Sequence, residues 1–385
     1  MRGVRLTFVT PEIRPFSHTG GLADVYDALP AALAAAGVEV TIVTPHYPRA
    51  AEAIAAAGLA VDELAAPPQR IGPVDHPLRF RLVSHHGCRI AFAVHDGFYD
   101  RPGLYVDEHG ADYGDNAARF AFLCRAAIAL AQVREQRPDV VHSNDWQTGL
   151  LPCFLRAGAL PGARSLFTIH NLVYQGQFAP DEVLTAGLGW SWFHPEALEF
   201  WGGLNLMKGG LIFADAITTV SPSYAEEIQT PAAGRGLDGV LRAQRHKLRG
   251  ILNGIDVRRW DPAADPHLPA PFSADDLAGK AACKRALQER CGLPLEAGAL
   301  LLGAVGRFDW QKGMPLICDA LPLVARLGVQ LVVLGTGDPA IEARVRDLAA
   351  RYPAQVAVTV GFDDALAHLI EGGAGGRCLV AERAG

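Results

Sequence analysis

The residues best suited to chemistry in this chain lie in a glycine-rich turn, Phe16 to Val25, with the sequence F-S-H-T-G-G-L-A-D-V. An apolar run, Val4 to Val9, precedes the turn, and a helical pattern of apolar residues, Leu22 to Ala36, follows it. Glycine lets the backbone approach a ligand closely, and a helix N-terminus offers free N–H groups to an anion. The segment therefore predicts a phosphate or diphosphate site, although a purely structural turn fits it as well. Its spacing matches neither the dinucleotide fingerprint nor the P-loop.

Polar residues and glycines follow several apolar runs in both halves of the chain. In doubly wound sheets, ligands bind at the carboxyl ends of the strands. The pattern therefore predicts one cleft between two domains, with anion-binding cations supplied by the second half. Each residue also has a structural alternative, because buried histidines and aromatic rings usually serve the core and surface cations are common. The residues are His142, Asp145, Trp146, His170 and Asn171 in the first half, and Arg307, Lys312, Gly335 and Gly337 in the second.

Two other groups of polar residues are interpreted without a ligand. His85 and His86 have no partner pattern and are interpreted as surface residues. Asp112, Asp115 and Asn116 precede a helical run, so they are more typical of a helix N-terminus than of a metal site.

Composition excludes several classes of protein. The net charge of −6 and the absence of any Lys or Arg run argue against a nucleic-acid partner. Seven scattered cysteines without C-x-x-C indicate reduced thiols and not a disulfide framework or a zinc site. The start of the chain does not read as a signal peptide, and the most apolar helical stretch, Phe120 to Val133, carries Arg125 and is too short for a membrane span. We therefore expect a cytoplasmic protein with no membrane partner.

Apolar runs alternate with helical patterns, which predicts an α/β fold of parallel sheets. The sequence predicts a first domain over residues 1–255, a linker over 256–276 with four prolines, and a second domain over 277–385. Pro67 to Pro77 is interpreted as a proline-rich loop. Predicted strands are Val38–Val43, Val140–His142, Ser165–Ile169, Ala216–Val220, Leu300–Val305, Val329–Leu334 and Val356–Val360.

The motifs occur in one order that is specific for a family. They are T-G-G-L-A-D-V, H-S-N-D-W-Q-T-G-L-L-P, T-I-H-N-L-V-Y-Q-G, F-A-D-A-I-T-T-V-S-P, G-L-D-G-V-L, G-I-L-N-G-I-D, R-x-x-x-x-K-G and L-G-T-G-D-P. From Arg5 to about Gly373 the chain closely resembles bacterial glycogen synthases, also called starch synthases. The resemblance implies a GT-B fold, in which two Rossmann-like domains face a cleft. It also implies transfer of glucose from ADP-glucose to the 4-OH end of an α-1,4-glucan, with retention and without a metal or cofactor.

The resemblance also assigns roles to residues of this chain. Arg307 and Lys312 would stabilise the charge that grows on the leaving diphosphate. His170 would contact the donor glucose, and Asp145 would hold a sugar hydroxyl. No pair of carboxylates reads as the nucleophile and acid of a glycosidase. The donor-binding residues that the resemblance implies are His18, Gly20, Gly21, Tyr105, Asn253, Gly335, Gly337 and Phe362.

Two departures from the family pattern bear on activity. The family has a lysine where this chain has His18, and free histidine is mostly neutral at pH 7. After A-L-A-H-L-I-E-G-G-A the family continues to a glutamate-containing E-x-x-G-L region, whereas this chain reads G-G-R-C-L-V-A-E-R-A-G. We therefore expect an incomplete second domain and little synthase activity. The alternatives are a remnant that only binds glucan or nucleotide, and an oxidoreductase, against which the missing G-x-G-x-x-G argues.

Overall fold

The chain folds into two units separated at the start of the predicted linker. The computed structural model describes residues 3–135 and 137–377. Unit 1 is Met1–Gly254 and unit 2 is Ile255–Gly385. Between the last strand of unit 1 and the first helix of unit 2, residues 251–278 are all described and form no helix or strand. The expected cleft concerns the placement of one unit against the other and stays a prediction.

Unit 1 is built on a mixed sheet of nine strands in its described part, in the order β12-β11-β7-β6-β1-β2-β5-β4-β3. The strands from β12 to β5 are parallel neighbours, and β5, β4 and β3 pair antiparallel. The α/β class is confirmed. The strands are β1 (Arg5–Val9), β2 (Glu39–Pro45), β3 (Asp62–Ile71), β4 (Val74–His85), β5 (Cys88–Val94), β6 (Val140–Asn144), β7 (Arg164–Ile169), β11 (Ala216–Thr219) and β12 (Leu248–Gly250). A small separate sheet holds β8 (Gln177–Phe178), β9 (Glu199–Phe200) and β10 (Gly203–Asn205).

The interpretation of Pro67 to Pro77 as a loop is wrong. This segment forms the end of β3, a tight turn and the start of β4. Two of its four prolines, Pro67 and Pro68, lie where the register shifts between Ala66 and Gln69. Proline has no N–H to donate, so it is tolerated on an edge strand and at a bulge. The same hairpin makes the sheet mixed, where the sequence predicted parallel pairing.

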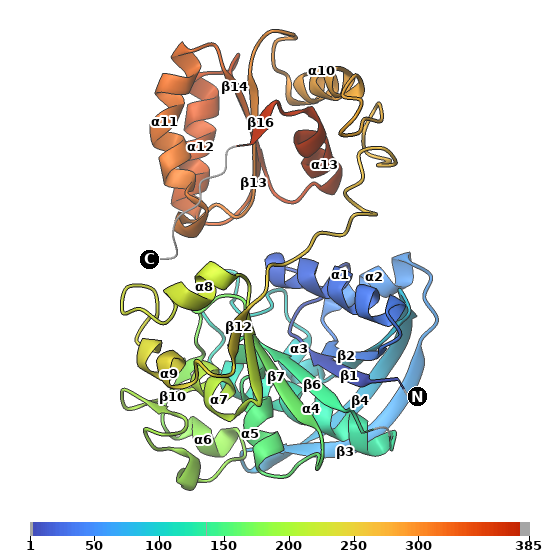
Figure 1. The fold of residues 1–385 in the computed structure, drawn as a ribbon, viewed down its shortest axis with the longest axis vertical. Helices are drawn as coiled ribbons and strands as arrows, with labels where there is room; N and C mark the ends of the chain where they lie inside the picture. Colours follow the sequence, from blue (N-terminus) through green and yellow to red (C-terminus); the bar gives the residue numbers. More distant parts are fainter. Residues whose placement is uncertain (1–2, 136, 378–385) are drawn as a thin grey trace. The chain divides into compact units, whose positions relative to one another are not determined.

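Helices cover both faces of the unit 1 sheet, with α1 and α2 on one face and α4, α5 and α7 on the other (Figure 1). Neighbouring residues of β1 point to opposite faces: Phe8 packs with α1 and α2, and Val9 packs with α4. The helices are α1 (Gly21–Ala35), α2 (Pro48–Ala56), α3 (Asp96–Tyr99), α4 (Asn116–Val133), α5 (Leu150–Arg156), α6 (Glu182–Thr185), α7 (Leu206–Phe213), α8 (Pro222–Glu227) and α9 (Asp238–Ala243). Among the described residues, none of the helices combines the length and apolarity that a membrane crossing needs.

Unit 2 has a parallel sheet in the order β15-β14-β13-β16. Figure 1 shows α11 and α12 on one face and α10 and α13 on the other, each pair with its own apolar cluster. The elements are α10 (Gly279–Cys291), β13 (Leu301–Val305), α11 (Met314–Arg326), β14 (Gln330–Gly335), α12 (Pro339–Arg351), β15 (Val356–Val360), α13 (Asp364–Gly373) and β16 (Gly376–Arg377). Most of the divergent C-terminal sequence, residues 378–385, lies outside the described residues.

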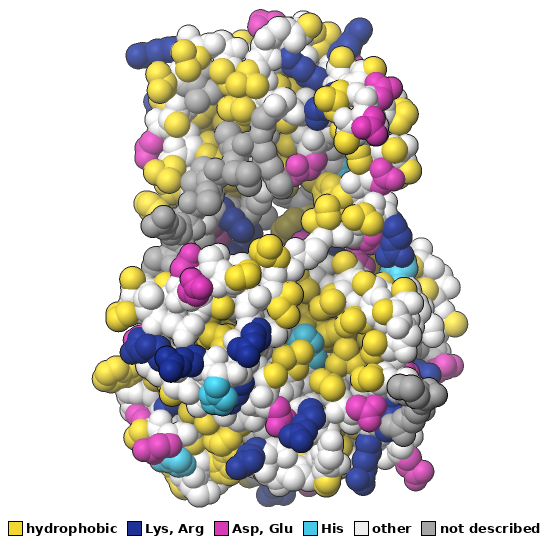
Figure 2. All heavy atoms as spheres, viewed as in Figure 1, with side chains coloured by type: hydrophobic (Ala, Val, Ile, Leu, Met, Phe, Trp, Pro, Cys, Tyr) yellow, Lys and Arg dark blue, Asp and Glu magenta, His cyan; other side chains and the backbone are white. Residues whose placement is uncertain are grey.

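The surface carries charges of both signs. Figure 2 shows basic side chains in small groups, separated by acidic and apolar ones, on the face in view. This distribution agrees with the net charge of −6 and offers no continuous basic band on that face.

A buried glycine of α7 provides a test of the packing in unit 1. A Cβ at Gly210 would lie 2.5 Å from ring carbons of the fully buried Phe167. Gly210→Ala should therefore lower the free energy of unfolding by about 1–3 kcal/mol, because an overpacked core must shift. The control is Gly239→Ala in α9, where the nearest atom, from Arg242, would be 3.9 Å away. Ala there should be neutral or stabilise by up to about 1 kcal/mol. Equal urea-unfolding midpoints for the two variants would contradict this packing.

Candidate active site

The polar residues of unit 1 come together at the carboxyl edge of its sheet. The parallel strands β1, β6 and β7 end side by side, with Val9 paired to Ser143 and Asn144 paired to Thr168. Asp145 follows β6 directly, and His170 follows β7 directly. The alternation of strands and helices therefore brings these two residues together, as the sequence predicted.

Asn144 is the buried centre of this edge. Its side-chain oxygen accepts hydrogen bonds from the Tyr26 hydroxyl of α1 and from His170 Nε2, the latter at 3.1 Å. Its side-chain nitrogen donates to the carbonyl of Val9 at 3.1 Å. Asn144 is fully buried, so these bonds are formed out of contact with water. Neither Asn144 nor Tyr26 was expected from the sequence.

The Asp145 carboxylate is held by backbone N–H groups. It accepts from His170 N at 2.7 Å and from Asn171 N at 3.3 Å. The residue has a φ of 52° and a ψ of −174°, a backbone conformation that is rare outside glycine. Burial raises the pKa of Asp145 to about 7, and the two N–H bonds oppose that rise. The group is therefore close to half ionised at neutral pH.

The two histidines beside Asp145 are neutral. Burial lowers the pKa of His170 to about 4. His142 lies within β6 rather than after it, bonds Thr168 at 2.6 Å, and has its pKa lowered to about 3 by burial and by the neighbouring His170. Because Asn144 Oδ1 accepts from His170 Nε2, the His170 proton lies on Nε2 and Nδ1 carries the lone pair. His142 therefore links β6 to β7 through Thr168. His170 has Nδ1 as an acceptor for a further hydrogen bond.

Trp146 belongs to the core rather than to the ligand side. It is 8% exposed, and its ring meets Phe120 edge to face at 5.0 Å. A Cβ at Gly176 would lie 2.4 Å from the Trp146 ring. Gly176 also has a φ of 62°, so the glycine that ends T-I-H-N-L-V-Y-Q-G is required by packing and by backbone conformation.

A buried glutamate, Glu12, organises the glycine-rich turn, although no local pattern in the sequence indicated it. Its carboxylate accepts from the Thr19 hydroxyl at 2.8 Å and from the Tyr105 hydroxyl at 2.6 Å. It also accepts from Thr19 N at 2.5 Å and interacts with the backbone N–H of Gly20. Burial raises the pKa of Glu12, and these donors oppose the rise. Tyr105, an expected donor-binding residue, thus has a partner within the protein.

The N-terminus of α1 is open at both glycines. Gly20 is the cap residue and Gly21 the first helical residue, and a Cβ at either would meet nothing within 4 Å. Since Gly20 N–H faces Glu12, the N–H groups left for an anion are those that begin at Gly21. His18 lies two residues earlier and is partly exposed.

In unit 2, the expected cations also follow the carboxyl end of a strand. Arg307 comes just after β13 and forms an ion pair with Asp309 at 3.3 Å. Asp309 caps the short helix Trp310–Lys312 by accepting from Lys312 N at 2.8 Å. The Lys312 side chain is exposed. One carboxylate therefore positions both cation-bearing residues.

Two glycines of unit 2 have a packing role. A Cβ at Gly335 would lie 1.8 Å from the carbonyl oxygen of Gly306, and one at Gly337 would lie 2.5 Å from that of Phe308. The loops after β13 and β14 thus touch through their backbones, with Phe308 N donating to Thr336 O at 3.0 Å. Close backbone packing alone is therefore enough to require both glycines of the L-G-T-G-D-P motif. The role of the motif in nucleotide binding stays a prediction.

The remaining expected positions are less enclosed. Phe362 follows β15 at the same edge as Arg307 and is 64% exposed. Asn253 lies in the exposed segment after β12. The expected helix N-terminus at Asp115 and Asn116 is confirmed, because α4 begins at Asn116 and Asp115 is its cap residue. His85, interpreted as a surface residue, is half-buried against Phe16, with 5.3 Å between ring centroids.

The raised pKa of Asp145 gives a testable pH dependence of stability. Its folded pKa of about 7 exceeds the ordinary 3.8, so the folded state holds a proton that the unfolded state releases, and stability is lost as the pH rises towards 7. Asp145→Asn keeps an oxygen for the two N–H bonds and removes the titration. Relative to the native chain, this variant should gain about 2 kcal/mol of unfolding free energy between about pH 5.5 and pH 7. If the two proteins differ in unfolding free energy, measured with urea, by the same amount at both pH values, the raised pKa of Asp145 is contradicted.

Comparison with known proteins places this arrangement in a family. Residues 5–243 match the family described as starch synthase catalytic domain. A glycogen synthase from Anaeromyxobacter sp. (strain Fw109-5) is 48% identical over 383 residues, which span 96% of this chain and 77% of that protein. A glycogen synthase from Myxococcus xanthus (strain DK1622) is 45% identical over 379 residues, which span 96% and 78%.

Solved structures agree. The catalytic domain of starch synthase IV from Arabidopsis thaliana, bound to ADP and acarbose, matches with a TM-score of 0.87 and 30% identity, over 97% of this chain and 77% of that chain. A sucrose-phosphate synthase from Thermosynechococcus elongatus, at a TM-score of 0.52 and 16% identity over 97% and 74%, shares the fold. Together with the ordered motifs, these matches show that the chain belongs to the glycogen and starch synthase family of GT-B glycosyltransferases.

Proposed function

We propose that this chain transfers glucose from ADP-glucose to the 4-OH end of an α-1,4-glucan, with retention at the anomeric carbon. Relatives of similar sequence are named glycogen synthases, and the matching starch synthase IV structure holds ADP and acarbose. Unit 1 would be the acceptor side and unit 2 the nucleotide-sugar side. The six described cysteines are free, in line with a cytoplasmic location.

The observation that carries the proposal is the placement of the expected residues at the carboxyl edge of each sheet. At the edge of unit 1, neutral His170 and the carboxyl group of Asp145 can hydrogen-bond sugar hydroxyls. At the edge of unit 2, Arg307 and Lys312 offer positive charge to a diphosphate. Each edge therefore fits one part of a nucleotide sugar.

The chemistry then divides between the two edges. Breaking the bond between the anomeric carbon and the diphosphate builds negative charge on the leaving phosphate, which Arg307 and Lys312 would stabilise. Arg307 would exchange its ion pair with Asp309 for the phosphate. His170 Nδ1 would accept a hydrogen bond from a donor-glucose hydroxyl, while Nε2 stays bonded to Asn144. Neither the charge nor the hydroxyl contacts require a metal or an organic cofactor.

The test is incorporation of labelled glucose from ADP-glucose into glycogen by the purified 385-residue chain, with and without EDTA. Calorimetric binding of ADP is measured in parallel. Slow incorporation that EDTA leaves unchanged is the expected result, because His18 stands where the family has a lysine and the sequence after Gly373 diverges from the family. Binding of ADP without transfer would support the alternative of a non-catalytic remnant. No binding of ADP, or equal use of an unrelated nucleotide sugar, would overturn the proposed donor.

Lys312 gives the sharpest test of the unit 2 site. Lys312→Ala should weaken ADP binding and lower any turnover by roughly tenfold to a thousandfold, because one charge contact to the phosphate is lost. The control is Arg326→Ala, which also removes an exposed cation but lies at the C-terminal end of α11, at the other edge of the sheet. Similar ADP affinity in both variants would remove Lys312 from the site.

A further inference from the structure

The turn between β4 and β5 has an unusual residue at a demanding position. His85 pairs with Cys88, so His86 and Gly87 form a two-residue hairpin turn. Both turn residues have positive φ, 48° for His86 and 76° for Gly87. Such turns favour Asn-Gly or Asp-Gly, and a histidine in this conformation carries a steric cost. Steric preference alone therefore does not account for His86 at this position.

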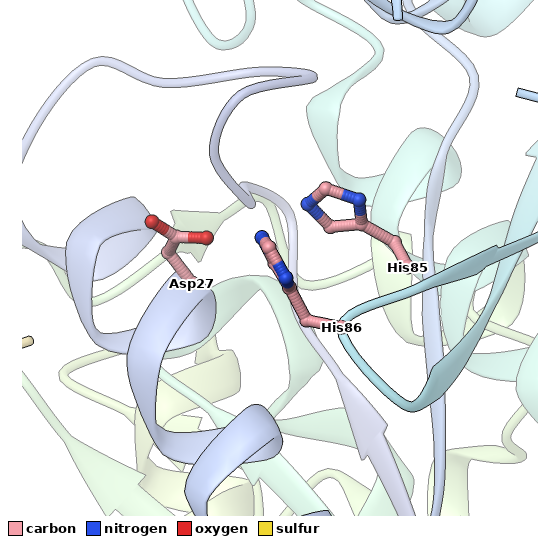
Figure 3. A group of neighbouring side chains, drawn as sticks. All are labelled: Asp27, His85 and His86. Carbon is pink, nitrogen blue, oxygen red and sulfur yellow. The ribbon is translucent and has the colours of Figure 1, made fainter. Parts of the chain in front are cut away.

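The left-handed turn places two imidazoles side by side. Consecutive strand residues normally point to opposite faces, yet the His85 and His86 ring centroids are 3.9 Å apart. Asp27, on α1, points towards the same spot, and a ring nitrogen of His85 faces both other side chains (Figure 3). One ligand atom from each of the three residues lies within 4.8 Å of the others. Two elements far apart in sequence thus converge on one point.

We propose that Asp27, His85 and His86 form a binding site for a zinc ion. Imidazole nitrogens and a carboxylate oxygen bind zinc at about 2.0–2.2 Å, which puts neighbouring ligand atoms of a tetrahedron roughly 3.3 Å apart. Donor atoms within 4.8 Å therefore need only side-chain rotation to reach that geometry. Three protein ligands leave the fourth position to water. The mixture of nitrogen and oxygen donors suits zinc better than calcium or magnesium, which favour oxygen alone.

The surroundings favour a neutral histidine as a ligand. The three residues line a small cavity with the apolar Ile13, Ile42 and Ile90. His85 Nε2 is enclosed and has no hydrogen-bond partner among the described residues. Burial lowers the pKa of His85, and the neighbouring His86 lowers it further. An uncharged imidazole with an unused nitrogen is the form that binds a metal.

Two other groups line the cavity and do not block a cation. Arg14 forms an ion pair with Asp24, which offsets its positive charge. Cys88 shares the cavity, but its thiol is not among the three converging ligand atoms. We therefore assign water, and not a thiolate, to the fourth position.

A second cluster, His267, Asp364 and His368, has comparable spacing. Asp364 forms an ion pair with Arg259 at 2.5 Å, and His368 Nδ1 bonds Asp265 at 2.6 Å. A metal there would displace the arginine from its carboxylate. This cluster serves as the internal alternative in the experiment.

The experiment titrates Zn²⁺ alone into the EDTA-treated, full 385-residue chain by calorimetry, and follows the melting temperature in parallel. The native chain should bind one zinc ion at this site and melt at a higher temperature with zinc, because zinc binds the folded state. Asp27→Asn and His86→Asn should each weaken binding by about tenfold or more, since each loses a ligand. Asn is favoured at the first position of this hairpin turn, so His86→Asn preserves the fold.

Two matched variants act as controls. His109→Asn removes a histidine that is 81% exposed and lies outside the cluster, and it should bind zinc like the native chain. His267→Asn tests the second cluster and should also leave this binding event intact. The proposal is overturned if the native chain binds no zinc, if His86→Asn and Asp27→Asn bind as the native chain does, or if only His267→Asn loses binding. None of these readouts depends on glucosyl transfer.

Discussion

The hydrogen bonds of one buried amide, Asn144, hold the edge of the unit 1 sheet together. Through one side chain, β6 is tied to Val9 at the end of β1, to Tyr26 in α1 and to His170 after β7. An amide can do this because its oxygen accepts two bonds while its nitrogen donates. Every group that unit 1 is proposed to offer to a sugar is therefore positioned, directly or through a neighbour, by a residue that stays out of contact with solvent.

The same edge is organised before any ligand arrives. Glu12 already engages Thr19, Tyr105 and the N–H of Gly20, and Asp145 already engages two N–H groups after β7. These bonds fix the glycine-rich turn and leave α1 to present the N–H groups that begin at Gly21. A site preorganised in this way loses little conformational entropy when a ligand binds. More of the interaction free energy is therefore kept as binding affinity.

The sequence predicted the fold where apolar runs are continuous, and it failed where pairing is local or irregular. Strands such as Val356–Val360 were recovered because a buried parallel strand reads as an apolar run. The β3–β4 hairpin was missed because β3 carries prolines and charged residues, which an edge strand tolerates. Asp145 and His170 were found through motifs. Glu12 and Asn144 were not, because bonds such as those to Tyr105 and Val9 span 93 and 135 residues, and no local spacing records them.

The carboxyl groups of unit 1 oppose the binding of an anion at its glycine-rich turn. A diphosphate at the N-terminus of α1 would approach two buried carboxyl groups, and the pKa of Asp145 is already raised, mainly by burial and in small part by like-charge repulsion from Glu12. A further negative charge would raise both pKa values again, so the anion and a proton at Asp145 favour each other. Unless cations supply the opposite charge, anion binding near neutral pH therefore takes up protons. In the proposed function, Arg307 and Lys312 would supply this positive charge to the leaving diphosphate.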